Sequence, residues 1–211
     1  MQIEQRLRHI TDPTPCDPFV VRCADADAPT RLVSEMTFRG PFVRCYLSAF
    51  DALIDSAALC AASTSLYQAV RVSDFPDDAP IDGDTQQMVI FHLGWRARNR
   101  RVLRRPDGRL SGIGWPQLPC PAGPGIEIQF RALLSMSELF EAAGLYAWRE
   151  VNRLLAVRSQ ARLAEDALGA LNASDADYET DEVDYNQVAL FDPEACEWHF
   201  VSRRKVYNRA F

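Results

Sequence analysis

Three side chains in this sequence are candidates for covalent or acid–base catalysis. Cys120 lies between two prolines, so it is the most accessible thiol, and His92 or His199 could serve as its base. Cysteine catalysis needs a thiolate that a neighbouring base or a helix N-terminus stabilises. No sequence signature of a cysteine enzyme surrounds Cys120, and the common nucleophile, phosphate-loop and dinucleotide motifs do not occur. The sequence therefore favours a protein that is not an enzyme, with a hydrolase or transferase lacking a recognisable motif as the last alternative.

A metal or cofactor site is not predicted. The acids from Asp175 onwards alternate like the first three ligand positions of an EF-hand calcium loop. However, Thr180 stands where the sharp turn needs glycine, and Asn186 stands where the bidentate glutamate belongs. The histidines and the six cysteines are scattered, with no C-x-x-C pair. We therefore expect no metal, no cofactor and reduced thiols.

Two segments of opposite charge are the candidates for a binding role. The Arg-rich segment, residues 96–109, holds Arg96, Arg98, Arg100, Arg101, Arg104, Arg105 and Arg109. The acidic segment, residues 175–184, puts six carboxylates in ten residues. Its candidate partner-binding residues are Asp175, Asp177, Tyr178, Glu179, Asp181, Glu182 and Asp184. A concentrated charge of one sign steers association, and tyrosine is a favoured anchor at interfaces, so either segment could meet another molecule.

The sequence leaves three uses of the Arg-rich segment open. It could pair with acids of its own chain, at 74–84 or 175–184, or it could bind an acidic protein partner. It could also bind nucleic acid, with Trp95 and Trp115 stacking on bases. The net charge of −6 argues against a general nucleic-acid binder, because such proteins are normally basic overall.

Protein binding is the first functional hypothesis. A small acidic protein without motifs fits a bacterial inhibitor of the immunity or antitoxin type, whose acidic surface meets a basic toxin or effector. Nucleic-acid binding through the Arg-rich segment is the alternative. Both hypotheses predict that partner-binding residues lie in the two charged segments.

Size and composition predict one globular domain. At 211 residues and 47% hydrophobic, the chain can bury an ample core, so we expect a single domain over 1–211. It would comprise an irregular N-terminal part (1–30), an acidic connector (172–184) and a C-terminal hairpin (185–202). The start lacks the apolar centre of a secretion signal, and no apolar run approaches the ~18 residues of a membrane span. We therefore expect a cytoplasmic protein without a membrane partner.

The order of elements predicts an α+β fold in which a mainly antiparallel sheet packs against one long or kinked helix and a shorter helix. Apolar and β-branched runs predict strands at 19–21, 31–38, 41–47, 66–72, 87–95, 102–103 and 126–130. The 87–95 strand should be central because it is continuously apolar at 88–91. Residues 111–125 are rich in Gly and Pro and are predicted as a loop.

Two helical regions are predicted. Ser48 is a plausible N-cap for a helix over 48–62, with apolar residues at three- and four-residue spacing. Ser135 and Glu138 form a capping box that predicts the start of the long region, and Leu168-Gly169 predicts its end. Gly144 and Glu150 interrupt its apolar repeat, which favours two helices or one kinked helix over a coiled coil.

Overall fold

The computed structural model describes residues 18–25, 31–37, 40–74, 88–117, 130–155, 158–174, 176–178 and 185–204. All strands in these residues join one eleven-stranded sheet. They are β1 (Phe19–Cys23), β2 (Arg31–Leu32), β3 (Ser34–Thr37), β4 (Gly40–Tyr46), β5 (Tyr67–Arg71), β6 (Met88–Arg98), β7 (Arg101–Arg104), β8 (Gly112–Gln117), β9 (Ala176–Tyr178), β10 (Gln187–Asp192) and β11 (Glu197–Ser202). The helices are α2 (Ala49–Ala62), α3 (Phe130–Ala142), α4 (Trp148–Leu155) and α5 (Gln160–Ala173), with one 3-10 turn, η1 (Val72–Asp74).

Strand β6 is the centre of the sheet, as its continuous apolar run predicts. Strand β4 pairs with residues 88–91 of β6 and β8 with residues 89–95, whereas β10 and β7 pair with its last residues, 95–98. All pairings of the described strands are antiparallel except β4 with β6 and β7 with β9. The predicted α+β fold with a mainly antiparallel sheet is therefore confirmed.

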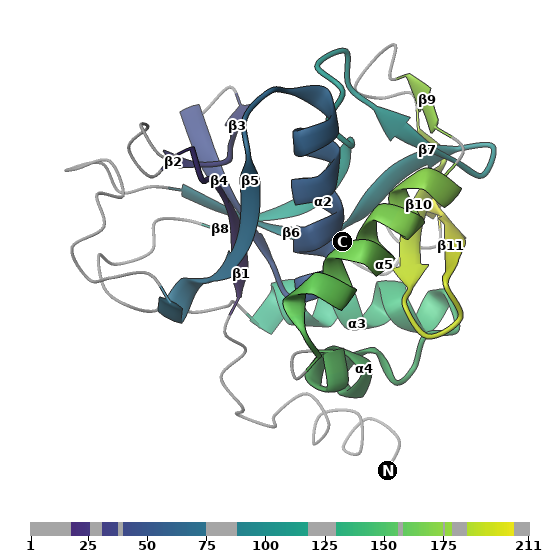
Figure 1. Cartoon of the computed structure of the whole chain (residues 1–211). Coiled ribbons are helices and arrows are strands. Elements are labelled where there is room, and N and C mark those ends of the chain that lie inside the picture. The colour runs from purple at the N-terminus through teal and green to yellow at the C-terminus, as the bar shows by residue number, and fades with distance from the viewer. Residues whose placement is uncertain are drawn as a thin grey trace.

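Helices cover both faces of this sheet. Figure 1 shows α2 and α5 side by side over one face, while α3 lies behind the sheet. Successive residues of a strand point to opposite faces, so two separate apolar cores form. Tyr46 and Phe191 pack on the side of α2 and α5, whereas Cys45 and Leu190 pack with Met136 of α3. No helix in the described part of the chain is long and apolar enough to cross a membrane.

Several local predictions are confirmed. Ser48 is the N-cap of α2, and its Oγ accepts the backbone N–H groups of Phe50 and Asp51. The C-terminal hairpin forms from β10 and β11, with Asp192 opposite Glu197. A turn that the sequence analysis did not use lies at 106–108, where Gly108 adopts a φ of +84° that a residue with a side chain rarely takes.

The predicted boundaries of the long helical region are wrong. Helix α3 begins at Phe130, five residues before Ser135, so the capping box does not mark its start. Gly144, with a φ of +84°, follows the last turn of α3, and the left-handed backbone there ends the helix. The region contains three helices, and α5 runs past Gly169 to Ala173. Packing of α5 against α2 and β11 outweighs the weak local preference of one glycine.

The stretch 111–125 is also not entirely a loop, because Gly112–Gln117 forms β8 beside β6. Glycine makes this pairing feasible at one close approach: a Cβ on Gly114 would lie 1.9 Å from Cγ2 of Ile90. The strand predicted at 126–130 lies outside the described residues, apart from Phe130, which belongs to α3.

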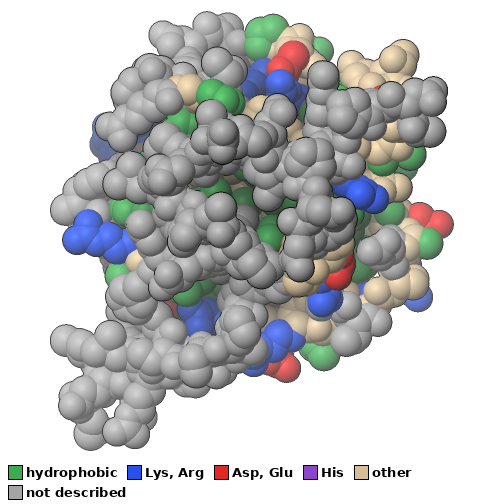
Figure 2. Space-filling model, turned by 90° about the vertical axis from the view of Figure 1, so that its left-hand side faces the viewer, with side chains coloured by type: hydrophobic (Ala, Val, Ile, Leu, Met, Phe, Trp, Pro, Cys, Tyr) green, Lys and Arg blue, Asp and Glu red, His purple; other side chains and the backbone are tan. Residues whose placement is uncertain are grey.

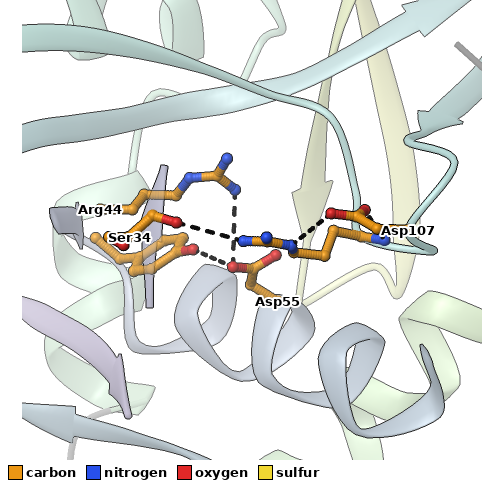
Figure 3. A network of polar contacts seen from close by, with 6 residues as sticks. Ser34, Arg44, Asp55 and Asp107 are labelled. Atoms are coloured by element: carbon orange, nitrogen blue, oxygen red, sulfur yellow. Dashed lines mark hydrogen bonds and ion pairs between the residues drawn. The ribbon is translucent and has the colours of Figure 1, made fainter. Parts of the chain in front are cut away.

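A buried ion pair joins β4 to α2. The Tyr46 hydroxyl donates a hydrogen bond to Oδ2 of Asp55, and Nη1 of Arg44 lies 3.7 Å from the same oxygen (Figure 3). Asp55 is fully buried and Arg44 nearly so. Burial opposes the charge on Arg44, but Tyr46 and Asp55 offset it and raise the arginine pKa above its ordinary value. The charged groups therefore depend on each other inside the core.

Truncating one member of this pair should be strongly destabilising. We expect Asp55→Ala to lower the free energy of unfolding by about 3–5 kcal/mol, because it leaves the Arg44 charge buried without its carboxylate. The control is Glu150→Ala, which removes the exposed partner of Arg153 (3.4 Å) and should cost about 0–1 kcal/mol. Urea unfolding measures both values. Equal losses in the two variants would contradict a structural role for the buried pair.

Candidate functional site

The Arg-rich segment forms the end of β6, a tight turn and β7. Asn99 and Arg100 make the turn with φ angles of 53° and 62°, in the left-handed region that two-residue hairpin turns require. The backbone N–H of Arg100 donates to Oε1 of Gln187 at 2.8 Å, and its guanidinium lies 5.5 Å from the ring centre of Phe200. These contacts hold an arginine in a conformation that usually favours glycine or asparagine.

The structure brings the two charged segments together at one point. Strand β9 pairs with β7 and places Asp177 opposite Leu103. Nη2 of Arg98 lies 2.7 Å from Oδ2 of Asp177, and this hydrogen bond holds the pKa of Asp177 below its usual range. Two further arginines are engaged within the chain: Arg96 lies over the ring of Tyr185 and Arg109 pairs with Asp107.

The remaining candidates of the two segments are placed as follows. Arg101 is exposed at the start of β7, while Arg104 and Arg105 are partly buried. Tyr178 ends β9 and is 65% exposed. The other candidates of the acidic segment lie outside the described residues: Asp175, Glu179, Asp181, Glu182 and Asp184.

The face turned toward the viewer in Figure 2 shows how described charges are distributed elsewhere. Basic side chains lie singly among hydrophobic and polar ones, and red and blue groups are interspersed.

The histidines and cysteines considered for catalysis do not form a common site among the described residues. His92 is buried beside Tyr46 and Trp95, and burial followed by the charge of Arg44 moves its pKa well below its ordinary value. No described residue hydrogen-bonds to either ring nitrogen of His92. His199 lies on the C-terminal hairpin, and Cys120 lies outside the described residues. Among the described cysteines no disulfide forms, and no group of three potential metal ligands comes together.

The sequence analysis missed a second acid on α2, Asp51. It is 7% exposed, and no described residue donates a hydrogen bond to its carboxyl group. Burial, and then the nearby charge of Asp55, raises the pKa of Asp51 to about 7. Its spacing from Asp55 was the available signal, because two carboxylates four residues apart in an apolar helix lie on one side of that helix.

Asp51 lines a pocket of about 160 Å³. The N-terminal end of α2, the α3–α4 connection and the β10–β11 turn form it. Its polar side chains are those of Ser48, Asp51, Tyr146, Asn152, Asp192 and Glu194, and its large apolar ones are those of Phe50, Phe140, Leu145, Trp148, Val151 and Phe191. A perturbed acid in a hollow of this kind is a common property of binding and catalytic sites.

Comparison of the chain with protein-family models, with curated proteins and with solved structures gives no match in any of the three. Function is therefore argued from the geometry of this chain's own residues.

Substituting Asp51 should change stability in a pH-dependent way. The folded protein holds a proton on Asp51 up to about pH 7, whereas an unfolded aspartate releases it near 3.8. Between these values the unfolded state binds fewer protons, so wild-type stability from this group falls as pH rises and is lost above pH 7. Asp51→Asn removes the effect. The free energy of unfolding of the variant, relative to that of wild type, should therefore grow by roughly 1 kcal/mol per pH unit and then level off above pH 7.

Chemical unfolding of both proteins from pH 4 to pH 8.5 measures this difference, and contributions from groups that do not interact with Asp51 cancel in the comparison. Asp166→Asn, at a less buried acid on α5, should give no such trend. A stability difference between wild type and Asp51→Asn that does not change with pH would contradict the buried, unpaired carboxyl group.

Proposed function

We propose that this chain is a cytoplasmic protein-binding protein of the inhibitor type, as immunity proteins and antitoxins are. Its acidic segment, 175–184, meets a basic protein partner. The observation that supports this proposal is that arginines of the Arg-rich segment contact other residues of this same chain.

Arginines of that segment contact their own chain. Arg98 pairs with Asp177, Arg109 with Asp107, and Arg96 and Arg100 lie over aromatic rings. These contacts reduce the basic surface that the segment offers to an acidic molecule. The net charge of −6 therefore reflects acids that these arginines do not neutralise. The negative electrostatic field of such acids accelerates the encounter with a basic partner.

The position of β9 also supports the proposal. Among the described strands, β9 pairs only with β7, so it lies at an edge of the sheet. Tyr178 is mostly exposed there, and tyrosine provides a large contact area with a polar end.

Asp177 has a different role from its neighbours in this proposal. Its carboxylate is held by Arg98, so it anchors the acidic segment to β7 instead of meeting the partner. Nucleic-acid binding, the alternative, gains support from no contact of the Arg-rich segment. It would rely on arginines of that segment for contacts with phosphates.

Neutralising the outer acids should abolish partner binding without unfolding the protein. The test variant combines Asp175→Asn, Asp181→Asn and Asp184→Asn and keeps Asp177. A pull-down from the native host with mass spectrometry identifies candidates, and each purified candidate is then titrated against wild type and variant. We expect a basic protein whose affinity for the variant is at least tenfold weaker and whose association with wild type slows as salt is added.

The matched control carries the same change in net charge at acids outside the segment, namely Asp74→Asn, Glu165→Gln and Asp166→Asn. It should bind the partner like wild type. An acidic partner, a nucleic acid with a steep salt dependence, or equal affinity of the triple variant and wild type would each contradict the proposal.

A further inference from the structure

The acids on α2 outnumber the cations that meet them. Asp55 receives both the Tyr46 hydroxyl and the Arg44 guanidinium. Asp51, one helical turn earlier, receives no hydrogen bond from any described residue although it is more than nine-tenths buried. An ionised carboxylate in such a place is unfavourable unless a cation or several donors reach it.

The pocket beside Asp51 provides room for such a cation. Its volume of about 160 Å³ exceeds that of several water molecules, each of which takes roughly 30 Å³ in the liquid. Phe50, Phe140 and Trp148 line it, and their side chains form an aromatic wall against which the apolar stem of a cationic group can pack. Tyr146, which is 78% exposed, also lines it.

The other charged groups of the surrounding elements favour a cation as well. Asp192 and Glu194 line the pocket from the hairpin turn, and both are acids. Oδ1 of Asp192 accepts the backbone N–H groups of Glu194 and Ala195, which fixes this turn. His199 lies 3.8 Å from Oδ2 of the same aspartate and does not line the pocket.

The arginines nearest in the chain are committed to other groups. Arg149 of α4 lies over the ring of Trp148 at 5.3 Å and donates to Oγ of Ser137 at 3.3 Å. Arg153 pairs with Glu150 at 3.4 Å. Neither arginine lines the pocket, nor does Glu141 of α3. Asp51 therefore has no cation of its own chain in the described residues.

We propose that this pocket binds a guanidinium group, which donates hydrogen bonds to the Asp51 carboxylate and lies against the aromatic wall. The cation stabilises the ionised form of Asp51, so a proton leaves the protein when the cation binds near neutral pH. The site is independent of the proposed protein partner, because α2, the α3–α4 connection and the β10–β11 turn build it without the acidic segment.

Propylguanidinium is the direct probe, and N-propylurea is its uncharged counterpart of the same shape. Amide chemical shifts should change at 144–148 and 192–195 on addition of propylguanidinium, and the urea should leave them unchanged. Calorimetry at pH 7 in two buffers of different ionisation enthalpy should reveal proton release, and the release should vanish at pH 8.5. Asp51→Asn, which keeps the shape of the side chain, should weaken binding at least tenfold and remove the proton release.

Asp107→Asn is the matched control, because it neutralises an acid outside the pocket and should leave binding unchanged. No binding of propylguanidinium, equal binding of the urea, or unchanged affinity in Asp51→Asn would overturn the proposal. Each of these results leaves the protein-partner proposal intact, because that proposal is tested at the acidic segment with different variants.

A capped arginine, N-acetyl-arginine N-methylamide, identifies the source of the cation. If it binds with the affinity of propylguanidinium, the pocket accepts the side chain of a protein or peptide. If only propylguanidinium binds, the pocket is a site for a free small cation. Both results support the recognition of a cation by Asp51.

Discussion

The central constraint in this protein is a shortage of positive charge at α2, where two buried acids have only one buried arginine near them among the described residues. Two carboxylates, Asp51 and Asp55, are buried on this helix, but Arg44 is paired with only one of them. The paired acid fastens the helix to β4 and therefore to the sheet. The unpaired acid is left beside a pocket, where its charge is unfavourable until a cation arrives. One acid thus stabilises the fold, and the other gives the fold a binding property at the expense of stability.

The oppositely charged residues of the Arg-rich and acidic segments are arranged differently. Arg98 and Asp177 are 79 residues apart in the chain but meet at 2.7 Å, because β9 adds to β7. Two further arginines of the same segment lie over aromatic rings. The Arg-rich segment is in large part an architectural element that connects β6, β7 and the C-terminal hairpin. This internal use makes the acidic segment the better candidate for contact with a partner.

The sequence predicted the elements whose signals are local and agree with the tertiary packing. The apolar run of β6 and the Ser48 cap of α2 are examples. The capping box at Ser135 failed because packing of α3 on the sheet extends the helix in front of it. The pocket could not be predicted, because its walls come from three distant parts of the chain. Only the four-residue spacing of Asp51 and Asp55 indicated the pocket. The sequence does not show which of the two acids meets a cation, because that depends on the tertiary structure.

The ionisation of Asp51 tests the central claim most directly. Carbon-13 NMR of its side-chain carboxyl group, assigned by comparison with Asp51→Asn, follows the proton across the pH range in the protein without added ligand. A buried acid that no cation meets should titrate with a pKa of about 7. A midpoint near the ordinary value of 3.8 would show that water or a donor already satisfies the carboxylate, and the shortage of positive charge would not exist.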